Sequence, residues 1–248
     1  MIGFISAGFN PPMSLTREEM EFLDRSRIIL VDTYTSPNYL KELGDRELTF
    51  VGRDKMENYE WMLREEGDVS IVIPGESFSA TTHFNIYKEA RIRGLEVKVF
   101  HNSSIFPAAA LAMGLHLYKI GPAVSLPRFK DKFRPLSPYE KVLENQRRGL
   151  HTILLLDTEP PMELSDALNE MMWMEAELKG GIFGSDAEIG VVSCLGSKEE
   201  MVVYEKISVL KELSIGKTPY TIVIPSELHF QEREAIELFR VGHFDSSR

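Results

Sequence analysis

Short apolar runs alternate with segments of helical periodicity along most of the chain. The apolar runs are rich in β-branched residues, which is typical of buried strands. Runs of this kind predict strands at residues 2–7, 28–32, 48–51, 68–73, 96–100, 151–156, 188–193 and 220–224. Strands that alternate with helices predict an α/β protein whose sheets are mostly parallel and are covered by helices.

The segments between the strands carry helix signals at their ends. Thr16 to Glu19 reads TREE, in which the threonine hydroxyl and the glutamate carboxylate can cap each other's backbone N–H groups. Gly94 and Gly114 mark helix ends, because glycine accepts the left-handed conformation common just past a helix. Helices are predicted at 80–93, 104–113, 139–148, 163–178 and 227–239.

A proline-rich stretch at 121–138 has no apolar periodicity and is predicted to be an extended loop at or beside a domain boundary. The chain should therefore form two α/β lobes, 1–116 and 117–248. Within the loop, RFKDKFR at 128–134 interleaves four basic residues with two phenylalanines. Both a solvated connection and a loop that contacts a partner fit this segment.

Composition narrows the class of protein. Hydrophobic residues make up 43% and charged residues 27%, as in globular proteins. The 28 basic and 38 acidic residues give a net charge of −10, which disfavours broad binding to a phosphate backbone. The N-terminus lacks the features of a signal peptide and no apolar run approaches a membrane span, so a cytoplasmic protein is expected. The single cysteine, Cys194, is expected as a buried strand thiol.

Common catalytic motifs are absent from the sequence. It contains no GxGxxG after the first strand, no phosphate-binding GxxxxGK[ST], and no GxSxG. The six histidines show no metal-ligand spacing, so no metal is expected. Nucleotide hydrolysis and serine hydrolase chemistry therefore lack support.

Polar loops follow three of the predicted strands. They read DTYTSP at 32–37, PGESFSATTH at 74–83 and HNSSI at 101–105. In open parallel sheets, ligands bind beyond the carboxyl ends of strands. Hydroxyl groups such as those of Ser79 and Ser104 also cap helices, but three such loops together favour a ligand-binding cleft.

These motifs resemble those of the diphthine synthase family, within the tetrapyrrole methylase-like methyltransferases. PGESFSATTH is similar to the family's PGDPxxATTH, and HNSSI follows at the expected spacing. YTS at 34–36, GLHLYKIG at 114–121, RGLHTILLLD at 148–157 and IPSELHFQERE at 224–234 also match in order. The resemblance extends over essentially the whole chain.

The resemblance implies a homodimeric enzyme with S-adenosylmethionine in a cleft between two α/β lobes. The family's cofactor positions, carried over by motif, fall on Phe9, Glu76, Ser79, Ser104, Ile105, Leu156, Leu195 and Tyr220. From the residues alone, Leu156 and Leu195 fit equally well as core leucines. The sequence departs from the family pattern at Ser6, Asp32, Glu76, Ser77 and Tyr220.

The acceptor implied by the resemblance is the 3-amino-3-carboxypropyl-histidine of translation elongation factor 2, N-methylated repeatedly. Repeated methylation releases protons, and Asp32, Glu76 and His83 are candidates to take them. Thr81, Thr82 and His83 are expected on the acceptor side. Two alternatives stay open: a methylase of a small tetrapyrrole-like acceptor, and a cofactor-binding protein that has lost catalysis.

Overall fold

The computed structural model describes residues 1–36, 40–41 and 43–242, so Pro37 of the first polar loop lies outside the described residues. The chain divides into two units, Met1–Ile105 and Phe106–Arg248. The prediction of two α/β units is confirmed, but the division comes earlier than the expected boundary at residue 116. The segment after Ile105 packs with the second unit, because the Met113 side chain lies directly over Gly190.

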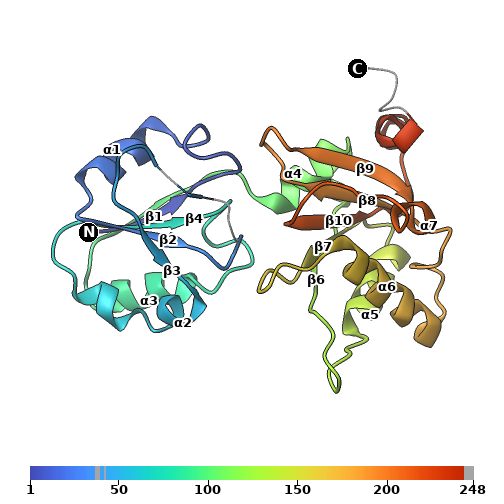
Figure 1. Cartoon of the computed structure of the whole chain (residues 1–248), viewed down its shortest axis with the longest axis horizontal. Coiled ribbons are helices and arrows are strands. Elements are labelled where there is room, and N and C mark those ends of the chain that lie inside the picture. Colours follow the sequence, from blue (N-terminus) through green and yellow to red (C-terminus); the bar gives the residue numbers. More distant parts are fainter. Residues whose placement is uncertain (37–39, 42, 243–248) are drawn as a thin grey trace. The chain divides into compact units, whose positions relative to one another are not determined.

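The first unit contains a parallel sheet with the strand order β3-β2-β4-β1-β5 (Figure 1). Its strands are β1 (Ile2–Ser6), β2 (Ile28–Asp32), β3 (Thr49–Val51), β4 (Val69–Ile73) and β5 (Val97–Phe100). Its helices are α1 (Arg17–Arg25), α2 (Arg53–Glu57), a 3₁₀ turn (Tyr59–Arg64) and α3 (Phe84–Ile92). All four pairings are parallel, as the alternation of strands and helices predicted.

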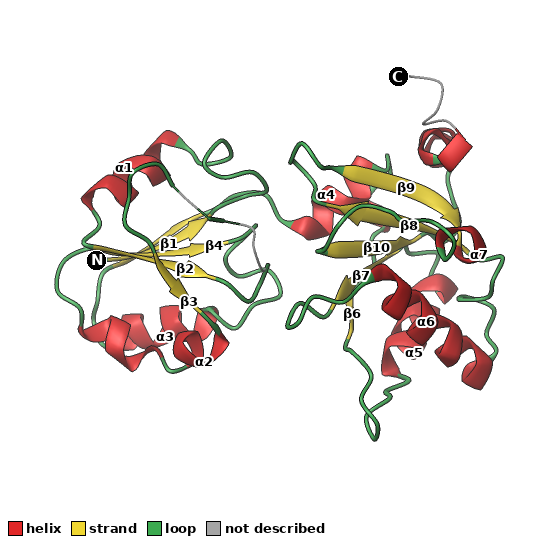
Figure 2. Cartoon of the chain, viewed as in Figure 1, coloured by secondary structure: helices red, strands yellow, loops and turns green. Residues whose placement is uncertain are grey.

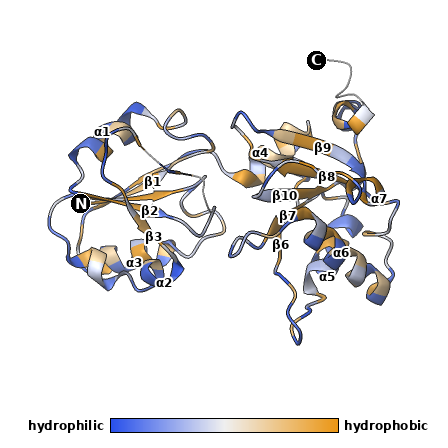
Figure 3. Cartoon of the chain, in the orientation of Figure 1, coloured by the Kyte–Doolittle hydropathy of each residue, from blue (hydrophilic) through white to orange (hydrophobic). Residues whose placement is uncertain are grey.

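Both faces of this sheet are buried. Successive side chains of a strand point to opposite faces, so neighbouring residues of one strand belong to different apolar clusters. In β1, Phe4 joins the apolar cluster that includes Ile86 of α3, whereas Ile5 joins the cluster that includes Phe22 of α1. Figure 3 shows the strands coloured as apolar and the outer faces of the helices as polar. The continuous apolar runs in the sequence therefore reflect burial on both sides.

Two details at helix ends test the sequence predictions. The capping box is confirmed: the N–H of Glu19 donates to Oγ1 of Thr16 at 3.2 Å, and the N–H of Thr16 donates to the Glu19 carboxylate at 2.6 Å. The helix predicted at 80–93 begins only at Phe84. Ala80 has a left-handed φ of 59°, which prevents a helix from continuing through it.

The second unit contains a sheet with the order β6-β7-β10-β8-β9 (Figure 2). Its strands are β6 (Val124–Leu126), β7 (Thr152–Leu156), β8 (Glu188–Ser193), β9 (Met201–Lys206) and β10 (Tyr220–Ile224). Only β6 and β7 pair in parallel, so the prediction of mostly parallel sheets is wrong here. The short connection from β8 to β9 allows only antiparallel pairing, and the sequence reading missed both β9 and β6.

The helices of the second unit are α4 (Ile105–Ala112), α5 (Ser137–Arg147), α6 (Leu164–Leu178), α7 (Ile207–Leu210) and α8 (Phe230–Ile236). Leu117–Lys119 and Glu237–Phe239 form 3₁₀ turns. Cys194 is not a buried strand thiol: it follows β8, is half-buried and has a φ of 50°.

No helix within the described ranges is long and apolar enough to cross a membrane.

Candidate functional site

Four loops of the first unit leave its sheet at one edge. Because β1, β2, β4 and β5 all run in parallel, their carboxyl ends meet there. The loops comprise residues 7–16, 33–36, 74–83 and 101–104. The prediction that the three polar strand-end loops come together is confirmed for their described residues. The loop at 74–83 contacts 101–104 through Glu76 and Ser79, and it contacts 32–36 through Thr82 and His83.

The loops after β1 and β4 approach each other through glycine backbone. The N–H of Gly8 donates to the carbonyl of Gly75 at 3.1 Å, and the reverse bond is 2.9 Å. Both residues have left-handed φ values, 64° and 69°. A Cβ atom added at Gly8 would lie only 2.9 Å from Oδ1 of Asn102 and from Cβ of Ser14, so only glycine fits there without movement.

Glu76 joins the loop after β4 to the loop after β5. One carboxylate oxygen lies 2.9 Å from Nδ1 of His101, and the other accepts the N–H of Asn102 at 2.9 Å. Asn102 also donates from its side chain to the carbonyl of Ser14 at 2.9 Å, which adds the loop after β1. Sequence reasoning did not single out Asn102 or His101, although both belong to the HNSSI motif.

Ser79 and Ser104 make a second link between the same two loops. The hydroxyl of Ser104 donates to that of Ser79 at 3.1 Å. Phe9 follows Gly8, and Ile105 follows Ser104; both are partly exposed. The structure therefore brings the five predicted first-unit cofactor positions, Phe9, Glu76, Ser79, Ser104 and Ile105, onto adjoining loops.

Asp32 and His83 form a buried pair beneath the loop after β4. Nε2 of His83 lies 3.2 Å from Oδ2 of Asp32, and both side chains are fully buried. Asp32 also accepts the N–H groups of Tyr34 at 2.7 Å and of Thr35 at 3.0 Å, together with the Thr35 hydroxyl. Burial by itself raises the pKa of Asp32, but His83 and Thr35 outweigh it, so this pKa lies below its ordinary value.

The two ring nitrogens of His83 have fewer hydrogen-bond partners than the Asp32 carboxylate. Neither makes an aligned hydrogen bond within the described part of the chain, although Nε2 is close to Asp32. The ring stacks on Tyr34 with centroids 5.7 Å apart. Of the other predicted acceptor-side residues, Thr81 donates to the carbonyl of Ser77 at 2.6 Å and Thr82 is exposed, with its hydroxyl 3.2 Å from that of Tyr34.

Comparisons with known proteins identify the family. The sequence model described as Tetrapyrrole (Corrin/Porphyrin) Methylases matches residues 1–211. The diphthine synthase of Thermoplasma acidophilum is 33% identical, over 96% of this chain and 95% of that protein. That of Saccharolobus solfataricus is 32% identical, over 90% and 92%. The chain belongs to the diphthine synthase family of methyltransferases.

A solved diphthine synthase structure agrees in fold, with a TM-score of 0.85, 24% identity, and coverage of 96% of this chain and 95% of that one.

Two departures from the family motifs meet in the first unit of this chain. The hydroxyls of Ser6 and Ser77 lie 2.8 Å apart and both residues are fully buried. The N–H of Ser77 also donates to the Ser6 hydroxyl at 3.0 Å. Each unusual serine thus supplies the other's hydrogen-bond partner.

The three remaining family positions lie in the second unit. Because β10 is antiparallel to β7 and β8, its first residue, Tyr220, lies at the edge where those two strands end. Leu156 ends β7 and is buried in the core, and Leu195 is half-buried just past β8. The Tyr220 hydroxyl donates to the carbonyl of Ile215 at 2.8 Å. These three residues share one edge of the second sheet, and their contact with a cofactor stays a prediction.

The described residues include no group of three or more histidine, cysteine, aspartate or glutamate side chains arranged to hold a metal.

Proposed function

We propose that this chain uses S-adenosylmethionine to N-methylate the 3-amino-3-carboxypropyl-histidine of translation elongation factor 2, in diphthamide biosynthesis. Membership of the diphthine synthase family supports the reaction class. The observation that carries the proposal to this chain is the linked set of loops around Gly8, Glu76 and Ser104.

The residues on these loops fit the cofactor chemically. Among the described residues the Glu76 carboxylate has one hydrogen-bond partner on each oxygen, whereas each oxygen can accept two hydrogen bonds. It therefore retains capacity for ribose hydroxyls or an amino group. Ser79 and Ser104 offer hydroxyls, while Phe9 and Ile105 offer partly exposed apolar surface. Leu156, Leu195 and Tyr220 complete the proposed cofactor set.

The cofactor supplies, when bound, a methyl group on a positively charged sulfur. The chain's contribution is to hold the acceptor amine in line with that methyl group, because alignment replaces a bimolecular encounter. The amine must be neutral to react, so each round releases a proton. Asp32 is enclosed by donors and its pKa is lowered, which makes it a poor proton acceptor. We therefore assign Thr82, with Thr81, to acceptor contact, and His83 with Asp32 to holding the loop that carries them.

We further propose a cytoplasmic homodimer. Elongation factor 2 acts during cytoplasmic translation, which places the enzyme in the same compartment. A row of four rings on the second unit is our candidate for the dimer interface, and all but His116 are exposed. Tyr118, His116, His229 and Phe230 follow one another at centroid spacings of 5.1, 5.4 and 4.3 Å. Light scattering should report a monomer for Phe230→Glu, because the change places a charge in the proposed interface. The control Phe50→Glu, which alters an exposed residue of β3, should remain a dimer.

Calorimetric titration with S-adenosylmethionine, followed by mass spectrometry of elongation factor 2 carrying the unmethylated side chain, tests the activity. We expect binding and stepwise methyl gains on the modified histidine. More methyl groups than the amine can hold would place one on the carboxylate. Binding without transfer would favour a different acceptor or a protein without catalysis, and the absence of binding would refute the proposal.

Glu76→Ala supplies the residue-level test, with exposed Glu66→Ala as its matched control in the same unit. Glu76→Ala removes a charged carboxylate that would accept hydrogen bonds from the cofactor, so cofactor binding should weaken about tenfold or more. Equal affinities for the two variants would remove Glu76 from the cofactor set.

A further inference from the structure

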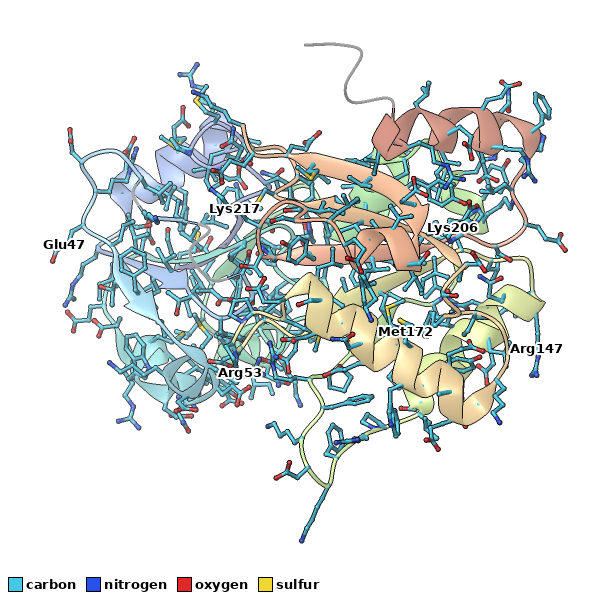
Figure 4. The ribbon with its side chains drawn as sticks, turned by 45° about the vertical axis from the view of Figure 1, so that its right-hand side comes forward. Glu47, Arg53, Arg147, Met172, Lys206 and Lys217 are labelled. Carbon is cyan, nitrogen blue, oxygen red and sulfur yellow. The ribbon has the colours of Figure 1, made fainter. Side chains whose placement is uncertain are left out.

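The proline-rich connection between β6 and α5 contains a short hairpin at residues 128–134. The N–H of Lys130 donates to the carbonyl of Phe133 at 3.0 Å, and the N–H of Phe133 donates back at 2.9 Å. Asp131 and Lys132 therefore form a two-residue turn. Figure 1 shows this segment extending past α5, and Figure 4 shows its end projecting away from α6, the helix that carries the labelled Met172. The sequence alone predicted only a loop here.

The base of the hairpin is held firmly by α6 and the segment before it. Arg128 donates to the carboxylate of Asp166 at 2.8 Å and to the carbonyl of Pro161 at 3.1 Å. The N–H of Phe129 donates to Glu170 at 2.8 Å. The Phe129 ring packs edge-on against Trp173 with centroids 5.3 Å apart. These contacts fix the base in advance, so little ordering would be needed when the tip binds a partner.

The tip is basic and exposed. Residues 130–134 are all exposed, and Phe133 keeps 53% of its surface accessible. Lys130, Lys132 and Arg134 make no ion pair within the described ranges, whereas Arg128 at the base does. The Arg134 guanidinium lies 5.6 Å from the Trp173 ring. On a chain of net charge −10, the tip is thus a local positive patch with an apolar side chain at its centre.

The chemistry of the tip favours a protein partner over a nucleic acid. Three cations neutralise few phosphates, and the remaining charge of the chain repels a polyanion. Aromatic side chains are enriched at protein interfaces, and charges around them steer a partner of opposite charge. We infer that the hairpin docks an acidic surface with an apolar recess on the acceptor protein, elongation factor 2. This inference rests on the proposed function.

The test measures methyl transfer to elongation factor 2 as a function of its concentration, with the full-length chain. The variants are Lys130→Glu with Lys132→Glu, and Phe133→Ala. The matched control is Lys141→Glu with Lys211→Glu, which reverses two exposed lysines elsewhere on the second unit. We expect the hairpin reversal to raise KM for elongation factor 2 about tenfold at low salt and less at high salt, because exposed charges are screened.

The expected pattern also includes an unchanged kcat, an unchanged cofactor Kd and an unchanged KM in the control. An unchanged KM in both hairpin variants would overturn the inference while leaving the proposed function intact. A parallel loss of cofactor affinity or thermal stability would also overturn it, since the hairpin would then be structural. If the unaltered chain neither binds nor methylates elongation factor 2, the proposed function and the partner named here fall together.

Discussion

Two fully buried carboxylates, one in each unit, lie beside buried histidines but differ in how completely they are satisfied. Glu232 of α8 contacts Nζ of Lys119 at 2.8 Å and Nε2 of His151 at 3.0 Å. It also accepts the N–H groups of His116 and His229, each at 2.8 Å. His151 uses its second nitrogen too, because Nδ1 accepts the N–H of Ser226 at 2.8 Å.

Asp32 of the first unit has a comparable set of donors, but the neighbouring His83 is less fully hydrogen-bonded than His151. Nδ1 of His83 has no hydrogen-bond partner within the part of the chain that the structure describes. A fully satisfied buried network rigidifies the elements that it joins, whereas a buried polar group without a partner points to a role other than stability. The comparison assigns Glu232 to stability and the Asp32–His83 pair to the loop at 74–83.

The largest expected effect is that of Glu232→Gln. The change removes the charge of a fully buried carboxylate from the partly buried Lys119 ammonium, and breaking such a pair costs about 3 kcal/mol of unfolding free energy. Urea denaturation measures it. The control is Glu234→Gln, an exposed glutamate of the same helix, for which we expect a change within about 0.5 kcal/mol. Equal effects of the two variants on the unfolding free energy would show that Glu232 does not stabilise the fold more than an exposed glutamate does.

The same cluster predicts acid lability. Burial raises the pKa of Glu232, but Lys119 and the backbone donors outweigh it and lower this pKa from 4.5 to about 2. Burial also lowers the pKa of His151 below 6.5. Both groups bind protons more readily when unfolded, so their stabilisation is complete at neutral pH. It is lost first from His151 as pH falls below 6.5, then from Glu232 as pH falls from 4.5 towards 2. Thermal unfolding across this range should show a steeper fall for the unaltered chain than for Glu232→Gln.

An intermediate effect is expected for Gly8→Ala, which tests how closely the loops at the first sheet's edge are packed. Steric contact with Asn102 and Ser14, added to a φ of 64°, should cost about 2–3 kcal/mol. Gly94→Ala is the control: its φ is 74°, but its Cβ would meet nothing within 4 Å, so only about 1 kcal/mol is expected. Cofactor affinity should fall in the first variant alone. Equal cofactor affinities of Gly8→Ala and Gly94→Ala would contradict close packing of the loops at the edge of the first sheet.

The smallest expected effect on stability is that of Asp32→Asn. This isosteric change removes a charge without leaving a lysine unpaired, so we expect a loss of about 1–2 kcal/mol of unfolding free energy by urea denaturation. Methyl transfer should fall by more than this loss of stability explains, because His83 would lose the carboxylate that lies 3.2 Å from its Nε2 beneath the acceptor loop. A loss of stability as large as that of Glu232→Gln would erase the distinction between the two carboxylates.

Sequence patterns located most strands within one or two residues, because a buried strand must be apolar wherever it pairs. They did not give pairing direction: the apolar runs of β8 and β10 look like those of β2 and β4, yet the former pair is antiparallel. The late start of α3 also escaped prediction, since the helix propensity of alanine gives no sign of the left-handed φ at Ala80.

The residues of this chain by themselves determined the α/β class, the capping box at Thr16 and the polar loops that carry Glu76, Ser79 and Ser104, because each depends on neighbours within a few positions. Only the tertiary structure decided that Asn102 would join three loops, that Ser6 would find Ser77, and that Glu232 would meet Lys119 and His151. Those contacts span tens of residues or more. They form only after the sheets have brought distant segments together, so no local pattern could indicate them.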